Sequence, residues 1–169
     1  NTFSSVNVSC YGGNDGSITS VQSGGQAPYS YLWSNGSTSQ SIFNLVAGTY
    51  TLSVVDANNC EVIDVIVITE SPQMQNTFVL TPSACFLNNG VAQILTSGGM
   101  PPYVSSWTDI NGIPVNPNSL AMGNYIVRVT DSIQCEMVDT ITITGSSSLP
   151  SNTFSSVNVS CYGGNDGSI

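Results

Sequence analysis

The chain opens on Asn1-Thr-Phe-Ser-Ser-Val-Asn-Val-Ser-Cys10-Tyr-Gly-Gly-Asn-Asp-Gly-Ser-Ile18, and this segment returns letter for letter as residues 152–169. A shorter echo lies between the two copies, where Asn1-Thr2-Phe3 returns as Asn76-Thr77-Phe78. An exact return at an offset of 151 residues indicates a tandem array. We therefore read the chain as one period of that array, followed by the opening of the next copy.

Each period divides into two related modules. The predicted domains are residues 1–75, residues 76–151 as a diverged second module, and residues 152–169 as the first strands of the next copy. Further words match at offsets of 74 or 75 residues. Ser23-Gly24-Gly25 returns as Ser97-Gly98-Gly99, and Trp33 returns as Trp107. Modules of this size bury too little surface to be very stable by core packing alone.

The composition excludes several classes of partner. The chain has ten carboxylates, one arginine, no lysine and no histidine, and its net charge is −9. A nucleic-acid partner is not expected, because a single arginine is too little to neutralise its phosphates. Membrane insertion is also excluded, since the longest apolar run, around 65–68, is far shorter than the ~20 residues of a membrane-spanning helix. We expect no cofactor and no metal, because close cysteine pairs are absent as well.

The cysteines repeat with the modules. Cys10 and Cys60 are 50 residues apart, and so are Cys85 and Cys135. This spacing predicts one disulfide per module, Cys10–Cys60 and Cys85–Cys135, with buried free thiols as the alternative. Cys161 is the next copy of Cys10, so its partner is expected beyond residue 169.

The hydrophobic pattern predicts an all-β fold. Tyr29, Tyr31 and Trp33 alternate along one expected strand, and helical periodicity is absent. Many short strands in each module favour small Ig-like, Greek-key β-sandwiches. The Leu-x-x-Gly-x-Tyr pattern is typical of a tyrosine corner, in which the phenol bonds to nearby backbone. The residues predicted to define the fold are Trp33, Gly48, Tyr50, Trp107, Gly123 and Tyr125.

The linkers predict how successive modules are arranged. Residues 70–75 and 145–151 are short, and each contains a proline, Pro72 or Pro150. A flexible spacer is usually longer and richer in glycine and serine. We therefore expect the modules to stack end to end as a semi-rigid rod, with adjacent repeats of the same chain as the first partners.

The first module resembles the SprB-type repeat of the giant gliding-motility adhesins of Bacteroidetes. The matching words include Cys10-Tyr-Gly-Gly-Asn-Asp-Gly-Ser-Ile18, Trp33-Ser-Asn-Gly36 and Leu45-Val-Ala-Gly-Thr-Tyr50. The resemblance implies a very long protein of the bacterial cell surface, exported by type IX secretion and used in adhesion or gliding. It brings no catalytic residues. We expect a structural filament, and the alternative is a module that binds a glycan or a protein. Lateral self-association and contact with external surfaces or glycans are further expectations.

The remaining motifs favour structure over chemistry. An enzyme is not expected, because histidine and lysine, the usual proton-transfer groups near neutral pH, are absent. Asn14-Asp15-Gly16 could be a calcium loop, but the second module has Asn88-Asn89-Gly90 there, so a turn is the better interpretation. Ser132 and Thr140 each follow an aspartate and precede an isoleucine, a motif typical of O-glycosylation in Bacteroidetes.

Overall fold

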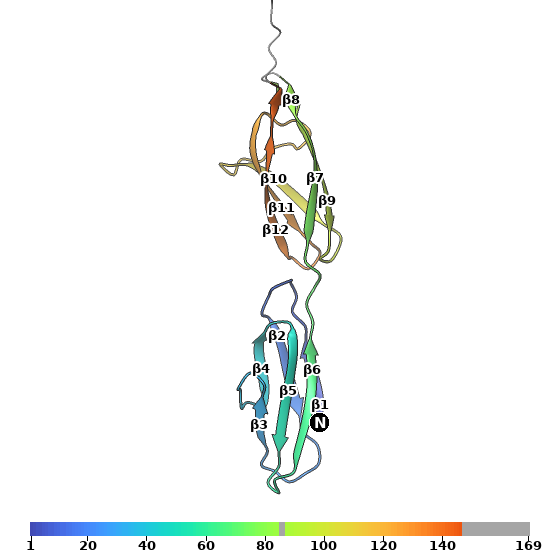
Figure 1. Ribbon diagram of the computed structural model, residues 1–169, viewed down its shortest axis with the longest axis vertical. Helices are drawn as coiled ribbons and strands as arrows, with labels where there is room; N and C mark the ends of the chain where they lie inside the picture. The colour runs from blue at the N-terminus through green and yellow to red at the C-terminus, as the bar shows by residue number, and fades with distance from the viewer. Residues whose placement is uncertain (85–86, 147–169) are drawn as a thin grey trace, which may run out of the picture.

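The chain folds into two successive β-sandwiches. The structure, a computed structural model, describes residues 1–84 and 87–146, and within these ranges its regular elements are all strands. The predicted all-β fold is confirmed for this part of the chain. Figure 1 shows strands β1 to β6 in one group and strands β7 to β12 in a second group, joined by a single segment of chain. We call these groups the first module and the second module.

The first module consists of two three-stranded antiparallel sheets. One sheet has the order β1-β2-β4 and the other the order β3-β5-β6. The strands are β1 (Thr2–Val6), β2 (Gly16–Val21), β3 (Ser30–Trp33), β4 (Ser41–Leu45), β5 (Gly48–Val55) and β6 (Glu61–Ile68).

Alternation along β5 shows why these residues form a sandwich. Tyr50, Leu52 and Val54 are buried, while the residues between them are only partly covered. Side chains point alternately to the two faces of a strand, so one face of β5 supplies the core. Trp33 lies opposite Leu52 on the neighbouring strand and is 2% exposed. The core is thus closed by residues from both sheets, including Ile18 and Ile42.

The second module repeats this plan with changes. Its strands are β7 (Gln75–Thr81), β8 (Ser83–Ala84), β9 (Val91–Ser97), β10 (Val104–Asp109), β11 (Gly123–Thr130), β12 (Glu136–Ile143) and β13 (Gly145–Ser146). The β10-β11-β12 sheet corresponds to β3-β5-β6, and β7-β9 corresponds to β1-β2. In the place of β4 the second module has an isolated bridge, Gly90 to Leu120.

The two sandwiches have separate cores. Tyr125, Val127 and Val129 of β11 take the places that Tyr50, Leu52 and Val54 have in the first module. The Phe78 and Trp107 rings pack edge to face, with centroids 6.3 Å apart. Figure 1 shows the first module below the second, with β6 running up into the joining segment and β7 continuing upward from it.

Candidate functional site at the module junction

The segment between β6 and β7 is bonded to both modules. On the side of the first module, Val8 N–H donates to the Thr69 carbonyl at 2.9 Å, and the Ser71 hydroxyl donates to the Ser9 carbonyl at 2.7 Å. On the side of the second module, Gly99 N–H donates to the Pro72 carbonyl at 2.8 Å. The linker therefore lies against the folded surfaces, unlike a free tether.

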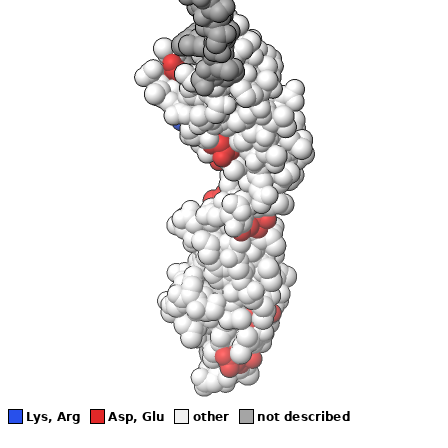
Figure 2. Space-filling model, turned by 45° about the horizontal axis from the view of Figure 1, so that its top comes forward, with Lys and Arg blue, Asp and Glu red and all other residues white. Residues whose placement is uncertain are grey.

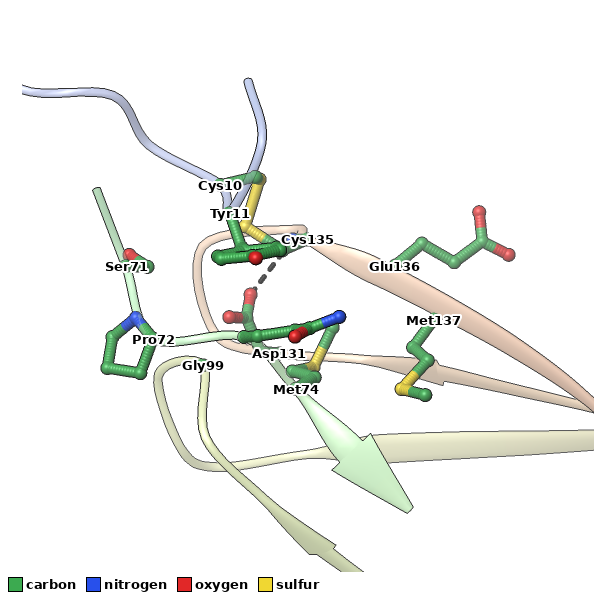
Figure 3. A pocket seen from close by; sticks show the side chains of 11 residues that line it. Cys10, Tyr11, Ser71, Pro72, Met74, Gly99, Asp131, Cys135, Glu136 and Met137 are labelled. Atoms are coloured by element: carbon green, nitrogen blue, oxygen red, sulfur yellow. Dashed lines mark hydrogen bonds between the residues drawn. A yellow bond between two sulfur atoms is a disulfide. The ribbon is translucent and has the colours of Figure 1, made fainter. Parts of the chain in front are cut away.

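A disulfide is the second covalent connection across this junction. Cys10 of the first module is bonded to Cys135 of the second, with their Cα atoms 5.6 Å apart and a sequence separation of 125. Figure 3 shows this bond beside Tyr11, Met74 and Asp131. The predicted Cys10–Cys60 and Cys85–Cys135 pairs are therefore wrong, since Cys10 and Cys135 are joined to each other.

The physical reason is the position of the cysteines at opposite ends of a module. Cys10 lies beside residues 69–71, just beyond the end of β6, whereas Cys60 comes directly before the first residue of β6. Strands rise about 3.3 Å per residue, so the eight residues of β6 separate the two cysteines by roughly 25 Å. A disulfide needs Cα atoms about 4.4–6.8 Å apart, which this length of strand forbids.

The remaining cysteines have different outcomes. Cys60 is exposed and free in this chain. Cys85 and Cys161 lie outside the described residues, so the expected partner of Cys161 beyond the chain stays a prediction.

Sequence reasoning missed Met74, which is 7% exposed at the junction, because a methionine in a linker carries no distinctive pattern.

Asp131 holds the turn that presents Cys135. Its Oδ1 atom accepts hydrogen bonds from the N–H groups of Ile133 at 3.0 Å and Cys135 at 2.9 Å, and its Oδ2 atom accepts from Met100 N–H at 2.9 Å. Burial alone would raise the pKa of Asp131, but these three N–H groups hold it below its usual value. Asp131 is 3% exposed, and its hydrogen bond to Cys135 N–H holds this cysteine in place for the bond to Cys10.

Close backbone approach also marks the junction. A Cβ atom placed on Gly98 would lie 1.9 Å from the Gln73 carbonyl oxygen, and one on Gly99 would lie 2.6 Å from the Met74 side chain. Side chains at these positions would push the linker away from the second module. The sequence showed that Ser23-Gly24-Gly25 returns as Ser97-Gly98-Gly99, but it gave no sign that the second copy receives the linker.

Each tyrosine predicted to define the fold donates a hydrogen bond to a backbone carbonyl that precedes it in the chain. The Tyr50 hydroxyl donates to the Val46 carbonyl, and the Tyr125 hydroxyl to the Ala121 carbonyl, both at 3.0 Å. Each phenol thus bonds to the backbone four residues upstream, the arrangement of a tyrosine corner. The Nε1 atom of Trp33 donates to the Ser39 carbonyl at 2.8 Å, and that of Trp107 donates to the Ser105 hydroxyl at 3.3 Å.

The two glycines predicted to define the fold differ in their constraints. A Cβ atom on Gly48 would meet no other atom within 4 Å, and one on Gly123 would only reach the Tyr125 hydroxyl at 4.0 Å. Gly123 has a φ of 157°, a conformation that L side chains rarely adopt, so its backbone favours glycine although space does not require it.

Ser132 and Thr140 are both exposed, Ser132 in the turn before Cys135 and Thr140 in β12. Modification at these two residues stays a prediction.

Asp15 is held by protein groups. Its carboxylate accepts hydrogen bonds from the Ser9 hydroxyl and from Ser9 N–H, the latter at 3.0 Å, and these bonds lower its pKa. Across the described ranges, 1–84 and 87–146, no three metal-ligating side chains come together. Asp15, directly before β2, thus closes the loop around Cys10 by bonding to Ser9 on its other side.

Residues 2–38 and 153–169 match the protein-family model described as SprB repeat. The prediction of an SprB-type repeat is thereby confirmed for these two segments. No curated protein matches the chain. Within the part of the chain that the structure covers, no helix is long and apolar enough to cross a membrane.

Solved structures with some likeness to this chain contain immunoglobulin-type domains. The N-terminal eight Ig domains of Down Syndrome Cell Adhesion Molecule isoform 1.30.30 give a TM-score of 0.40 at 12% identity, with 87% of this chain and 24% of that chain covered. The amphioxus IgVJ-C2 molecule gives 0.32 at 15% identity, covering 81% and 99%. DIP-gamma IG1+IG2 gives 0.34 at 10% identity, covering 86% and 98%. The chain thus spans about a quarter of the first of these proteins.

Proposed function

We propose that this chain is a structural repeat of a giant secreted surface protein, in which modules stack end to end into a rod. The observation that carries the proposal is the doubly connected junction, with the linker and the Cys10–Cys135 disulfide joining the same two modules. Two connections at different points restrict rotation that a single linker would allow. The exact return of residues 1–18 at 152–169 extends this unit into an array.

The proposed domains are residues 1–75, residues 76–151 and the opening of the next copy at 152–169. The match to the SprB repeat favours the bacterial cell surface, reached by type IX secretion, and a non-enzymatic role in adhesion or gliding motility. The first partners are adjacent repeats of the same chain. Lateral self-association and contact with external surfaces or glycans are the further partners that we propose.

The surface is consistent with a passive filament. Figure 2 shows a face that is largely uncharged, with carboxylates in a few small groups. Ten carboxylates and one arginine give a net charge of −9, which favours solubility of the chain. Such a surface gives little electrostatic attraction to anionic partners.

Electron microscopy of arrays with different copy numbers tests the rod. One period contains two modules, each built on strands of about eight residues plus loops, so we expect on the order of 60–80 Å of added length per period. The contour length is plotted against the number of periods. A constant increment with a straight outline is the expected result, and flexible beads without a fixed increment would overturn the proposal.

A recognition function is the alternative, and one observation favours it. The loop between β10 and β11 exposes Ile110 at 66% and Ile113 at 60%, and apolar side chains this open are suited to contact with a partner. A glycan array probed with one period tests this function. Saturable binding that is lost in Ile110→Ser would establish recognition, and its absence leaves the structural role.

A further inference from the structure

The two modules carry the same turn at one end. Asp56 Oδ1 accepts hydrogen bonds from Asn58 N–H at 2.8 Å and from Cys60 N–H at 2.9 Å. Asp131 Oδ1 makes the equivalent pair with Ile133 and Cys135. A backbone bond closes each turn as well, from Asp56 N–H to the Cys60 carbonyl at 3.1 Å in the first module. Cys60 and Cys135 are therefore presented by the same structure.

The loop beside this turn is also shared. Asp56 Oδ2 accepts from Gln26 N–H at 3.0 Å, as Asp131 Oδ2 accepts from Met100 N–H. The Tyr29 hydroxyl donates to the Gly24 carbonyl at 2.7 Å, and the Tyr103 hydroxyl donates to the Gly98 carbonyl at 2.5 Å. We call residues 22–29 with 54–62 the Cys60 end, and residues 96–103 with 129–137 the Cys135 end.

Only one of these two ends is covered. At the Cys135 end, Tyr11, Pro72 and Met74 line the hollow beside Cys135, and Cys135 is 7% exposed. At the Cys60 end a hollow also adjoins the cysteine, and Cys60 is exposed. The difference in exposure therefore reflects the module that sits over the Cys135 end.

Two glycines at equivalent positions of the two ends show the same difference. Gly98 leaves no room for a side chain, since its Cβ would lie 1.9 Å from the Gln73 carbonyl oxygen of the linker. Gly24 holds the equivalent place at the Cys60 end, with a φ of 77° against 73°, and its Cβ would meet nothing within 4 Å. The Cys60 end thus has open space where the Cys135 end receives a linker.

The sequence repeat identifies what fits this space. In the proposed array the module before a first module is a copy of the second module. The cysteine of that module at the position of Cys10 is Cys85, and an aromatic residue follows each, Tyr11 and Phe86. Cys85 and Phe86 lie outside the described residues, so their assignment rests on this correspondence in sequence.

We infer that the Cys60 end is the docking surface for the preceding module of the array, and that Cys60 forms a disulfide there with the Cys85 of the preceding period. The inference rests on the proposed array and adds a bond at every second junction, so that each junction has one. The two thiols lose two protons and two electrons. An oxidant disulfide, carried by an oxidoreductase or by glutathione, takes them up and is reduced to two thiols.

Counting free thiols in a chain of two consecutive periods tests the inference. Residues 1–151 are produced twice in succession, oxidised in a glutathione buffer, unfolded and titrated with a thiol reagent. We expect two free thiols, Cys60 of the first period and Cys85 of the second, because their partners are absent. Four free thiols would overturn the inference, as would a disulfide-linked peptide that joins Cys60 to any other cysteine.

One substitution placed in either period gives a matched control. Cys60→Ser in the second period removes a bonded cysteine and releases its partner, so the count should rise from two to three. Cys60→Ser in the first period removes a free thiol, so the count should fall from two to one. If the junction is not bonded, both variants lower the count by one.

The inference can fail while the proposed rod stands. Electron microscopy of the same two-period chain measures its length independently of its thiols. A straight rod with four free thiols refutes the Cys60–Cys85 bond alone. Two free thiols in a chain of flexible beads would instead refute the rod and keep the bond.

Discussion

Removing the junction disulfide should destabilise the chain strongly, whereas the same substitution at the equivalent turn should not. Cys135→Ser breaks the bond to Cys10 and replaces a buried disulfide sulfur by a hydroxyl. Cys60→Ser makes the same chemical change at an exposed, free cysteine of this single-period chain. The difference between the two variants therefore isolates the disulfide from the effect of the substitution itself.

The magnitude follows from the loop that the bond closes. For complete unfolding the bond spans 125 residues, which gives about 5 kcal/mol in the chain-entropy model. If one module unfolds while the other stays folded, the loop between the linker and Cys135 is about 60 residues, and the figure is about 4 kcal/mol. A module of this size has a total stability of only about 4–11 kcal/mol.

Denaturant unfolding followed by tryptophan fluorescence measures this effect module by module. Trp33 reports on the first core and Trp107 on the second, and both are buried. Trp33→Phe and Trp107→Phe backgrounds separate the two signals. Cys135→Ser should lower both transitions, and reduction of the unmodified chain should do the same. Equal midpoints for Cys60→Ser and Cys135→Ser, or no effect of a reductant, would refute the reasoning.

Four further outcomes are expected. Gly98→Ala should lower the denaturation midpoint more than Gly24→Ala, because both residues have positive φ but only the Gly98 Cβ would meet the linker, at 1.9 Å. Tyr125→Phe should cost about 1 kcal/mol in denaturant unfolding, since it removes one hydrogen bond to the Ala121 carbonyl. The pKa of Asp131 is lowered by folding, so its carboxylate stabilises the chain above about pH 4, and this contribution is lost as the pH falls through the folded-state pKa. Thermal melts from pH 6 to pH 2 should therefore show a smaller fall of the melting temperature with pH in Asp131→Asn than in the unmodified chain. Trypsin should leave the folded chain intact and cut it once after unfolding, because Arg128 is the only basic residue and lies in the central strand β11; reducing gel electrophoresis before and after unfolding checks this, since the Cys10–Cys135 disulfide joins the two fragments.

The strands could be predicted because their signal is local. Buried residues alternate with partly exposed ones along β5. Tyr50, Leu52 and Val54 therefore reveal a strand and its buried face without knowledge of the neighbouring strands. The same holds for Trp33 and for the repeat of the pattern in the second module. These features depend on the geometry of one strand, which the order of residues contains.

The disulfide could not be predicted in the same way, because its signal is not local. A spacing of 50 residues recurs in each module, but in a tandem array the pairing of Cys10 with Cys135 recurs just as regularly. Only the position of Cys10 beside Thr69 and Ser71 places it at the far end of β6 from Cys60. That position depends on contacts between residues more than 60 apart, so spacing alone favoured the wrong pair.

A covalent junction is the arrangement that suits this composition. With one arginine and ten carboxylates, the chain cannot supply an ion pair for each junction, and the salt bridge between Arg128 and Glu136 lies within the second module. Apolar contact at the junction is small, because Tyr11 remains 53% exposed and Met74 is the main buried side chain. The orientation of the modules must then come from the chain itself, through the linker hydrogen bonds and the disulfide. A junction held in this way depends on whether its cysteines are oxidised and hardly on ionic strength, since screening by salt acts on charges that the junction does not use.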